Sequence, residues 1–180
     1  MAQYTASIIT IGDEILIGQI LDSNSAWLAD YLFHAGFDVK EIRSISDQPK
    51  HIRQTIDDAI AATDLVLLTG GLGPTNDDRT KFALNEYFNG EMILNEAVLD
   101  DIKAFIVKKR GYLKLSENNK AQALVSNKAQ VIRNPIGTAP IQLFKQGKTV
   151  IVSMPGVPFE MKYVFEHKVM AELHNHFDLE

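Results

Sequence analysis

The apolar segment from Asp64 to Thr69, with the sequence DLVLLT, constrains the fold more than any other part of the chain. Leucine or a β-branched residue occupies nearly every position, so the segment lacks the alternation of apolar and polar residues that marks a strand with one face in water. A strand of this kind is buried on both faces, which is typical of a parallel sheet covered by helices. The segment therefore predicts a layered α/β domain.

Strand-like and helix-like segments alternate along the chain, which agrees with this fold class. Strands are expected at 6–11, 37–45 and 64–69, and helices at 23–35, 50–62, 79–87 and 96–109, with a short helix that begins near Ser116. Asp22 or Ser23 is the expected N-cap of the first helix, and Gly36 its end. Two strands joined by a tight turn within 139–154 precede a last helix, so we expect a mixed sheet that is mostly parallel.

Composition limits the classes of protein that this chain can represent. With 180 residues, of which 46% are hydrophobic, the chain can bury about 70% of its unfolded surface, as expected for one compact domain. The net charge of -5 argues against nucleic acid as a partner, because a phosphate backbone is bound mainly by clustered lysine and arginine. The chain has no cysteine, so a bound metal would need oxygen or imidazole ligands.

The two ends of the chain give further expectations. The N-terminal residues MAQYTASIITIGDE contain no basic region, and their apolar run is too short for a signal peptide or a membrane span. We therefore expect a cytoplasmic protein without a membrane partner. We interpret Leu179 and Glu180 as a cloning scar, so the expected single domain covers residues 1–178.

The loop TGGLGPTNDDRT at 69–80, directly after the buried strand, has the composition of an anion-binding site. Glycines let the backbone turn sharply and bring its N–H groups near a ligand, and the helix that follows adds the positive end of its dipole. The adjacent carboxylates of Asp77 and Asp78 would repel a phosphate unless a divalent cation lay between them. The alternative is structural: one aspartate caps the helix, and the glycines only turn the chain.

Three further loops with glycine, proline or polar residues follow strand-like runs. They are IGDEILIGQILDSNS at 11–25, NPIGTAP at 134–140 and MPGVPFEMK at 154–162. The first offers Asp13, Glu14 and Asn24, although polar residues there also serve a helix N-cap. Glu160 in the last loop is an ordinary residue for the first turn of a helix. Because open sheets bind ligands at the carboxyl ends of parallel strands, we expect these loops to gather around one site.

These loops, together with the segment NNKAQA at 118–123, resemble the signature segments of the molybdopterin-binding domain at the N-terminus of CinA, the competence- and damage-inducible protein. The resemblance covers nearly the whole chain in the same order. It implies a three-layer α/β/α sandwich with a mixed, mostly parallel sheet, related to MogA and MoaB of molybdenum cofactor biosynthesis. It also implies a homo-oligomer, dimer or trimer, and a C-terminal nicotinamide mononucleotide deamidase domain that is absent from these 180 residues.

The resemblance further implies a site for a small-molecule nucleotide or pterin phosphate and a divalent metal, namely Mg²⁺, Mn²⁺ or Co²⁺. Asp13, Asp77 and Asp78 would be catalytic, and Asp13, Glu14 and Asp78 would hold the metal. The ligand would be bound by residues from all of the loops and from the short helix: Gly70, Gly71, Gly73, Thr75, Asn24, Asn119, Gln122, Gly137, Thr138, Pro155 and Gly156.

The reaction that the resemblance implies is hydrolysis of the pyrophosphate bond in ADP-ribose or a related dinucleotide. With no cysteine, and no serine or lysine visibly paired with histidine, covalent catalysis has little support. A cation that activates water, with a carboxylate that takes the proton, needs only the groups present. Two other functions stay open: a non-catalytic module that binds molybdopterin or a nucleotide, and an oligomerisation domain for the deamidase.

Overall fold

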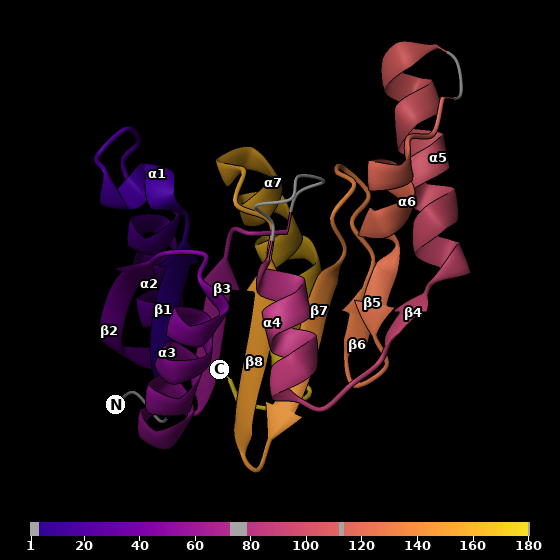
Figure 1. The fold of residues 1–180 in the computed structure, drawn as a ribbon. Helices are drawn as coiled ribbons and strands as arrows, with labels where there is room; N and C mark the ends of the chain where they lie inside the picture. Colours follow the sequence, from indigo (N-terminus) through magenta and orange to yellow (C-terminus); the bar gives the residue numbers. More distant parts are fainter. Residues whose placement is uncertain (1–3, 73–78, 112–113, 180) are drawn as a thin grey trace.

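The computed structural model describes residues 4–72, 79–111 and 114–179, which form one main sheet with helices on both faces and a smaller lobe beside it (Figure 1). The main sheet has six strands in the order β2-β1-β3-β8-β7-β6. Their bounds are β1 Tyr4–Ile11, β2 Phe37–Ile45, β3 Leu65–Thr69, β6 Gln130–Ile132, β7 Ile141–Gln146 and β8 Thr149–Met154. A separate two-stranded sheet consists of β4 Met92–Leu94 and β5 Leu124–Ser126.

The main sheet is mixed and mostly parallel, as the sequence predicts. Strand β1 pairs in parallel with both β2 and β3, and β3 pairs in parallel with β8. Strand β7 runs antiparallel to β8 and to β6, so the predicted hairpin between β7 and β8 is confirmed. Thr69, the last residue of β3, pairs with Thr10 of β1 and with Met154 of β8. The carboxyl ends of these three strands therefore lie at one edge of the sheet.

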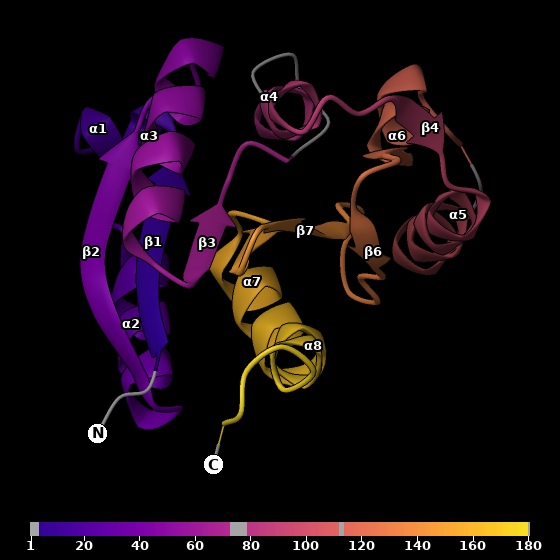
Figure 2. The ribbon, with the colours of Figure 1, turned by 90° about the horizontal axis from the view of Figure 1, so that it is seen from below.

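Helices cover both faces of this sheet, which confirms the three-layer α/β/α sandwich. The helices of this part are α1 Asp13–Leu16, α2 Ser23–His34, α3 Pro49–Ala62, α4 Thr80–Tyr87, α7 Pro158–Val164 and α8 Met170–Leu173. Leu65 and Leu67 of β3 pack in one core cluster with α2, α7 and α8. Val66 and Leu68 point to the other face and pack with α3 and α4. Figure 2 shows α4 and α7 on opposite sides of the sheet.

The C-terminal helix contains a π-helical turn, η1, at Phe165–Val169 between α7 and α8, whereas the sequence predicts one uninterrupted helix. Phe165, Val169 and Leu173 are all completely buried in the same core cluster. Residues four apart lie on one face of a helix, so all three face the sheet.

The smaller lobe contains α5 (Glu96–Arg110), α6 (Glu117–Gln122) and the β4–β5 pair, and it projects beside the main sheet in Figure 1. Its own core consists of Val98, Ile102, Ile106 and Ala123. The sequence predicts both helices but misses β4, β5 and β6, which have three residues each, and α1, which has four. Elements this short contain too few residues to show a helical or strand period. None of the helices in the described ranges is long and apolar enough to cross a membrane.

Leu179, which the sequence interpretation places outside the domain, packs against the core cluster that contains α2 and α8. Its backbone N–H donates a hydrogen bond to the carbonyl oxygen of Phe177 over 3.0 Å. Leu179 is therefore in contact with the packed domain.

Candidate functional site

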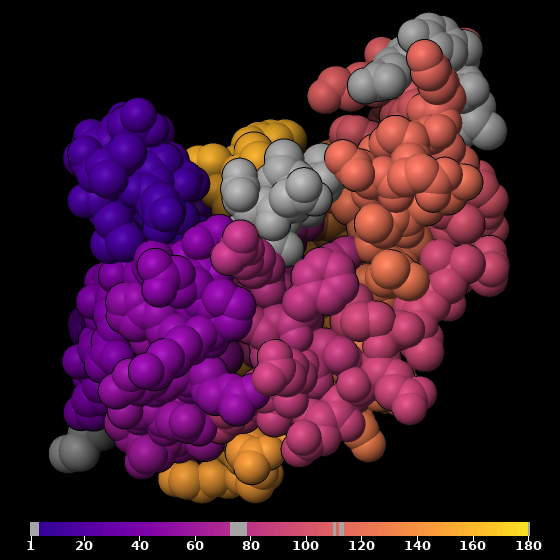
Figure 3. All heavy atoms as spheres, in the orientation of Figure 1, coloured from indigo at the N-terminus to yellow at the C-terminus, as the bar shows by residue number. Residues whose placement is uncertain are grey.

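A cavity of about 470 Å³ lies at the carboxyl edge of the main sheet, where β1, β3 and β8 end. Its walls come from α1 and the turn that follows it, the start of α2, the turn after β3, the end of α6, and the loops that precede β7 and α7. In the space-filling view of Figure 3, the α1 segment and the α5–α6 lobe project beyond this edge on opposite sides. Segments far apart in sequence thus form one site.

The turn after β3 requires glycine at two successive positions. Gly70 and Gly71 both have left-handed backbone conformations, with φ of 99° and 65°. A Cβ atom on Gly70 would lie 2.2 Å from the carbonyl oxygen of Ile11, and one on Gly71 would lie 1.9 Å from the Oγ1 atom of Thr80. These glycines therefore let the turn pass between the end of β1 and the start of α4, and leave its backbone facing the cavity.

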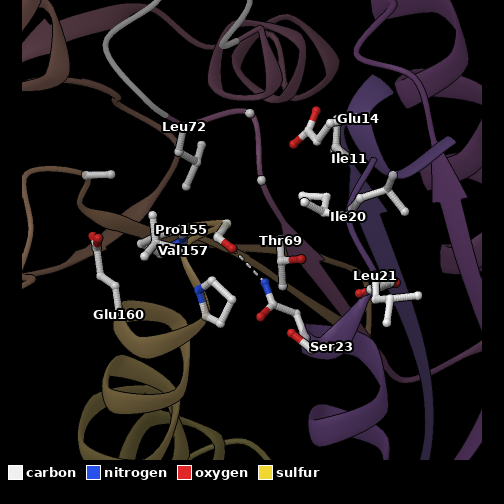
Figure 4. A pocket seen from close by; sticks show the side chains of 18 of the residues that line it. Ile11, Glu14, Ile20, Leu21, Ser23, Thr69, Leu72, Pro155, Val157 and Glu160 are labelled. Atoms are coloured by element: carbon white, nitrogen blue, oxygen red, sulfur yellow. Dashed lines mark hydrogen bonds between the residues drawn. The ribbon is translucent and has the colours of Figure 1, made fainter. Parts of the chain in front are cut away.

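The loop that precedes α7 packs directly against this glycine turn. A Cβ atom on Gly156 would lie 3.1 Å from the Cα atom of Gly70. The Nδ2 atom of Asn24, near the start of α2, donates a hydrogen bond to the carbonyl oxygen of Gly156 over 2.8 Å, drawn as a dashed line in Figure 4. Three segments separated along the chain are therefore held together at the floor of the cavity.

Asp22 has a structural role beside the cavity, as its position before α2 predicts. Its carboxylate caps α2 by accepting a hydrogen bond from the backbone N–H of Ser25 over 3.0 Å. The other carboxylate oxygen accepts one from the hydroxyl of Thr10 over 2.8 Å. The start of α2 is thus fixed to β1, and this positions Asn24.

Glu160 is a site residue that the sequence interpretation missed. Its side chain lines the cavity (Figure 4), and its Oε1 atom accepts a hydrogen bond of 2.5 Å from the Nδ2 atom of Asn134. Burial raises the pKa of the Glu160 carboxyl, and the hydrogen bond from Asn134 partly offsets this effect. Gly137 gives the carboxyl its space, because a Cβ atom there would lie 1.9 Å from Oε1. The only sequence signal for this site residue was that the loops 134–140 and 154–162 both carry glycine after a strand-like run.

Apolar side chains form much of the cavity wall and part of its rim (Figure 4). Leu72 is buried, whereas Ile20, Leu21 and Val157 are 52%, 93% and 59% exposed. A ligand that covers these rim residues would remove apolar surface from water, which is favourable for a flat ring system.

The structure brings together most of the predicted ligand residues. Those that line the cavity are Asn24, Gly70, Gly71, Gln122, Thr138, Pro155 and Gly156, and the predicted metal ligand Glu14 lines it as well. Gly137 lies behind Glu160, as described above. Asp13 is exposed and does not line the cavity. Asn119 does not line it either, because its side chain forms a capping box with Ser116 at the start of α6. Gly73, Thr75, Asp77 and Asp78 lie outside the described residues.

The described lining of the cavity is acidic. It includes the carboxylates of Glu14, Asp22 and Glu160 and no lysine, arginine or histidine. Three basic residues in or near the motif loops have other contacts: Lys120 with Glu117, Arg133 with Asp101, and Lys162 with the ring of Trp27. A phosphate in this part of the cavity would therefore face carboxylates.

The donor chemistry fits a hard divalent cation, because carboxylate and amide oxygens are the ligands that Mg²⁺ and Mn²⁺ prefer. Glu14 is exposed and has its carboxylate beside Gly12 at the cavity wall. Within residues 4–72, 79–111 and 114–179, no group of three or more histidine, aspartate or glutamate side chains could hold a metal. A metal centre held by three such side chains would therefore have to include ligands from 73–78.

Comparison with known proteins gives a consistent result. Residues 7–175 match the family model described as "Probable molybdopterin binding domain". The chain is 46% identical over 175 residues to a CinA-like protein of Flavobacterium psychrophilum, covering 96% of this chain and 41% of that relative. It is 42% identical over 173 residues to a CinA-like protein of Cytophaga hutchinsonii, with the same two coverages. The chain thus spans about two-fifths of the length of these relatives.

Two solved structures resemble this chain. The CinA protein of Thermoplasma acidophilum has a TM-score of 0.82 and 31% sequence identity, over 93% of this chain and 96% of that one. The tungsten cofactor synthesizing protein MoaB of Pyrococcus furiosus has a TM-score of 0.61 and 17% identity, over 96% of each chain. The second similarity is one of fold alone, and it agrees with the three-layer architecture.

Proposed function

Because the chain belongs to the CinA-like branch of the molybdopterin-binding domain family, we propose that its cavity binds a nucleotide or pterin phosphate. We further propose that, with a divalent metal, it hydrolyses the pyrophosphate bond of ADP-ribose or a related dinucleotide. The observation that carries the proposal is the cavity itself, where the glycine turn, the carboxylate of Glu14 and an apolar wall meet at the carboxyl ends of three parallel strands.

The size and lining of the cavity suit a ligand with a flat ring and a polar extension. A volume of about 470 Å³ falls within the range of roughly 300–1,000 Å³ that is usual for small-molecule sites. The ring would cover the apolar rim at Ile20, Leu21 and Val157. The phosphates would approach the Gly70–Gly71 turn, where the absence of side chains lets a ligand come close to the backbone.

The acidic lining supports a cation as part of this function, since a phosphate needs positive charge between it and the carboxylates. Glu14, with Asp77 and Asp78 from outside the described residues, would hold the metal. When bound, a divalent metal neutralises phosphate charge and makes water a better nucleophile. A second carboxylate, not bound to the metal, would take the proton from water. Leu72, Pro155 and their apolar neighbours would exclude bulk water.

A non-catalytic binding module is the second candidate function. The described lining contains no lysine, arginine or histidine side chain and no preformed group of three metal ligands. Such a cavity can bind a ring system without cleaving the attached phosphates. In that case, and equally if the chain is an oligomerisation domain, the activity of the whole protein would reside in the part that the relatives have beyond this chain.

The test is incubation of the purified chain with ADP-ribose or FAD and Mg²⁺, Mn²⁺ or Co²⁺, with the nucleoside monophosphate product measured by chromatography. The proposal predicts release of AMP from ADP-ribose that stops when the metal is chelated. Binding without any product would support the module, and neither binding nor product would leave oligomerisation as the remaining role.

A further inference from the structure

Two residues that line the cavity each have a buried acceptor atom without a hydrogen-bond partner in the structure. The two atoms are the Oδ1 atom of Asn24 and the Oε1 atom of Gln122. Asn24 is 7% exposed and Gln122 is 2% exposed. A buried acceptor without a donor costs free energy, so each of these atoms calls for a ligand or an ordered water.

The orientation of the Asn24 amide follows from its contact with the main chain. Its Nδ2 atom donates to the carbonyl oxygen of Gly156 over 2.8 Å. If the amide were turned over, two oxygen atoms would face each other at that distance, which is repulsive. The Oδ1 atom is therefore the acceptor that remains for another molecule.

Glu160 adds a third acceptor group. Its Oε1 atom receives the hydrogen bond from Asn134, which holds the carboxyl in place at the cavity wall. A carboxylate has two oxygens and about four acceptor positions, so this single bond leaves most of its capacity unused. A carboxylate can accept two adjacent donors of one ligand at the same time.

The protein offers these acceptors no cationic donor, since none of the described lining residues is lysine, arginine or histidine. The missing donors must therefore come from water or from the ligand. A phosphate cannot provide them, because an ionised phosphate has only acceptor oxygens. The acceptors thus select against the phosphate end of a ligand and for an end with N–H or O–H groups.

We propose that Asn24, Gln122 and Glu160 determine specificity by accepting hydrogen bonds from the N–H or O–H donors of a ligand, with adjacent donors at the Glu160 carboxylate. This inference rests on the proposed binding of a nucleotide or pterin in the cavity. The vicinal diol of a ribose and the amino–amide edge of a pterin ring both have this chemistry. The three acceptors line the cavity from α2, α6 and α7, and the phosphates would point toward the Gly70–Gly71 turn.

Uncharged probes test this proposal without a metal. Calorimetry would compare adenosine with 2′,3′-dideoxyadenosine, which lacks the diol, and pterin with lumazine, which carries an oxo group in place of the 2-amino group. The variants are Glu160→Gln, which keeps the shape but turns a free acceptor into a donor, and Gln122→Met, which removes the acceptor. Glu91→Gln and Gln130→Met make the same changes at exposed positions outside the cavity and serve as matched controls.

The proposal predicts that adenosine or pterin binds the parent chain and that its donor-poor analogue binds about tenfold more weakly. Each cavity variant should lose about tenfold in affinity for the donor-bearing probe without any loss of thermal stability, and both controls should bind at the parent value. The probe that shows this pattern identifies the diol or the pterin edge as the source of the donors.

Three results would overturn the proposal, because water would then satisfy these acceptors. They are equal binding of probe and analogue in both pairs, parent-like binding by both cavity variants, and no binding of either donor-bearing probe. Hydrolysis of ADP-ribose with Mn²⁺, measured on the same preparations, separates the two proposals. Donor-dependent binding without hydrolysis contradicts only the pyrophosphatase. Hydrolysis with unselective binding contradicts only the specificity role.

Discussion

The side chain of Asn24 binds the main chain of Gly156 through a 2.8 Å hydrogen bond that joins positions 132 residues apart. This bond connects the start of α2 to the loop before α7, and both segments line the same cavity. One side chain therefore links the packing of the two helices to the geometry of the candidate site.

The first prediction concerns this link. Asn24→Ala should lower the free energy of unfolding by about 1–3 kcal/mol, because it leaves the carbonyl of Gly156 without its donor. Urea denaturation measures the change, and Asn175→Ala, at an exposed position far along the chain, should change it by less than about 0.5 kcal/mol. Equal stability of the two variants would show that the bond does not hold the loops together.

The glycine turn gives a second prediction with a close control. Gly71 and Gly111 have similar left-handed backbones, with φ of 65° and 76°. A Cβ atom on Gly71 would collide with Thr80, whereas one on Gly111 would meet no atom within 4 Å. Gly111→Ala should therefore cost about 1–2 kcal/mol from backbone strain alone, and Gly71→Ala should cost about 3 kcal/mol or more. Chemical denaturation gives both values, and equal losses would contradict the collision.

A third prediction follows from the pKa of Glu160. Its carboxyl has a raised pKa in the folded protein because it is buried, so the folded state binds the proton more tightly than the unfolded state does. A glutamate carboxyl ordinarily titrates at pH 4.5. The contribution of the Glu160 proton to the free energy of unfolding is fully present below that pH and is lost as pH rises through the raised pKa of the folded state. Glu160→Gln removes this dependence.

Free energies of unfolding measured from about pH 4 to pH 8 provide the check. The parent chain should lose stability relative to Glu160→Gln as pH increases above 4.5. Asp64 is a control of opposite sign, because its hydrogen bond with Lys148 lowers the pKa of its carboxyl to about 2. Relative to Asp64→Asn, the parent should therefore lose stability as pH falls. A pH-independent difference for Glu160→Gln would contradict a desolvated carboxyl.

The fourth prediction concerns Asp78, which lies outside the described residues and is assigned from the sequence. Asp78→Asn should abolish metal-dependent turnover while the melting temperature stays at the parent value. Asparagine can still cap a helix, but the loss of one negative charge weakens a hard-cation site. A metal-activated nucleophile contributes several kcal/mol, so the expected loss is about 10²-fold or more in rate.

Asp77→Asn is the comparison for this variant, because the sequence predicts the same role for both acids. We expect one of the two substitutions to have the larger effect. If both variants hydrolyse ADP-ribose at the parent rate, the paired acids are not catalytic, and the binding module becomes the better account.

The fold could be predicted from the sequence where the segments were long and regular. The apolar run Leu65–Leu68 indicates a strand with helices packed on both faces, and both faces of β3 are indeed buried. Strands β4 and β6 were missed, because each has only three residues and forms a strand only by pairing with another segment. The π turn at Phe165–Val169 was also missed, because the apolar pattern there is that of one continuous helix.

The sequence indicated where in the fold the candidate site lies better than it indicated which side chains form it. The carboxyl edge and its loops were anticipated, since strand ends and glycines are visible in a sequence. The roles of individual side chains were harder to predict because they depend on three-dimensional partners. Asn119 has a polar side chain of the kind that contacts ligands, but it caps its own helix. Glu160 looks in the sequence like an ordinary residue of a first helical turn, but it lines the cavity.

The most direct test of the central claim is a crystal structure of the chain with Mn²⁺ and an ADP-ribose analogue whose diphosphate bridge is a methylene group. The account predicts that the analogue occupies the cavity, with its diphosphate at the Gly70–Gly71 turn and an anomalous manganese peak between the diphosphate and Glu14. Electron density for the analogue at the opposite edge of the sheet, or outside this cavity, would contradict it.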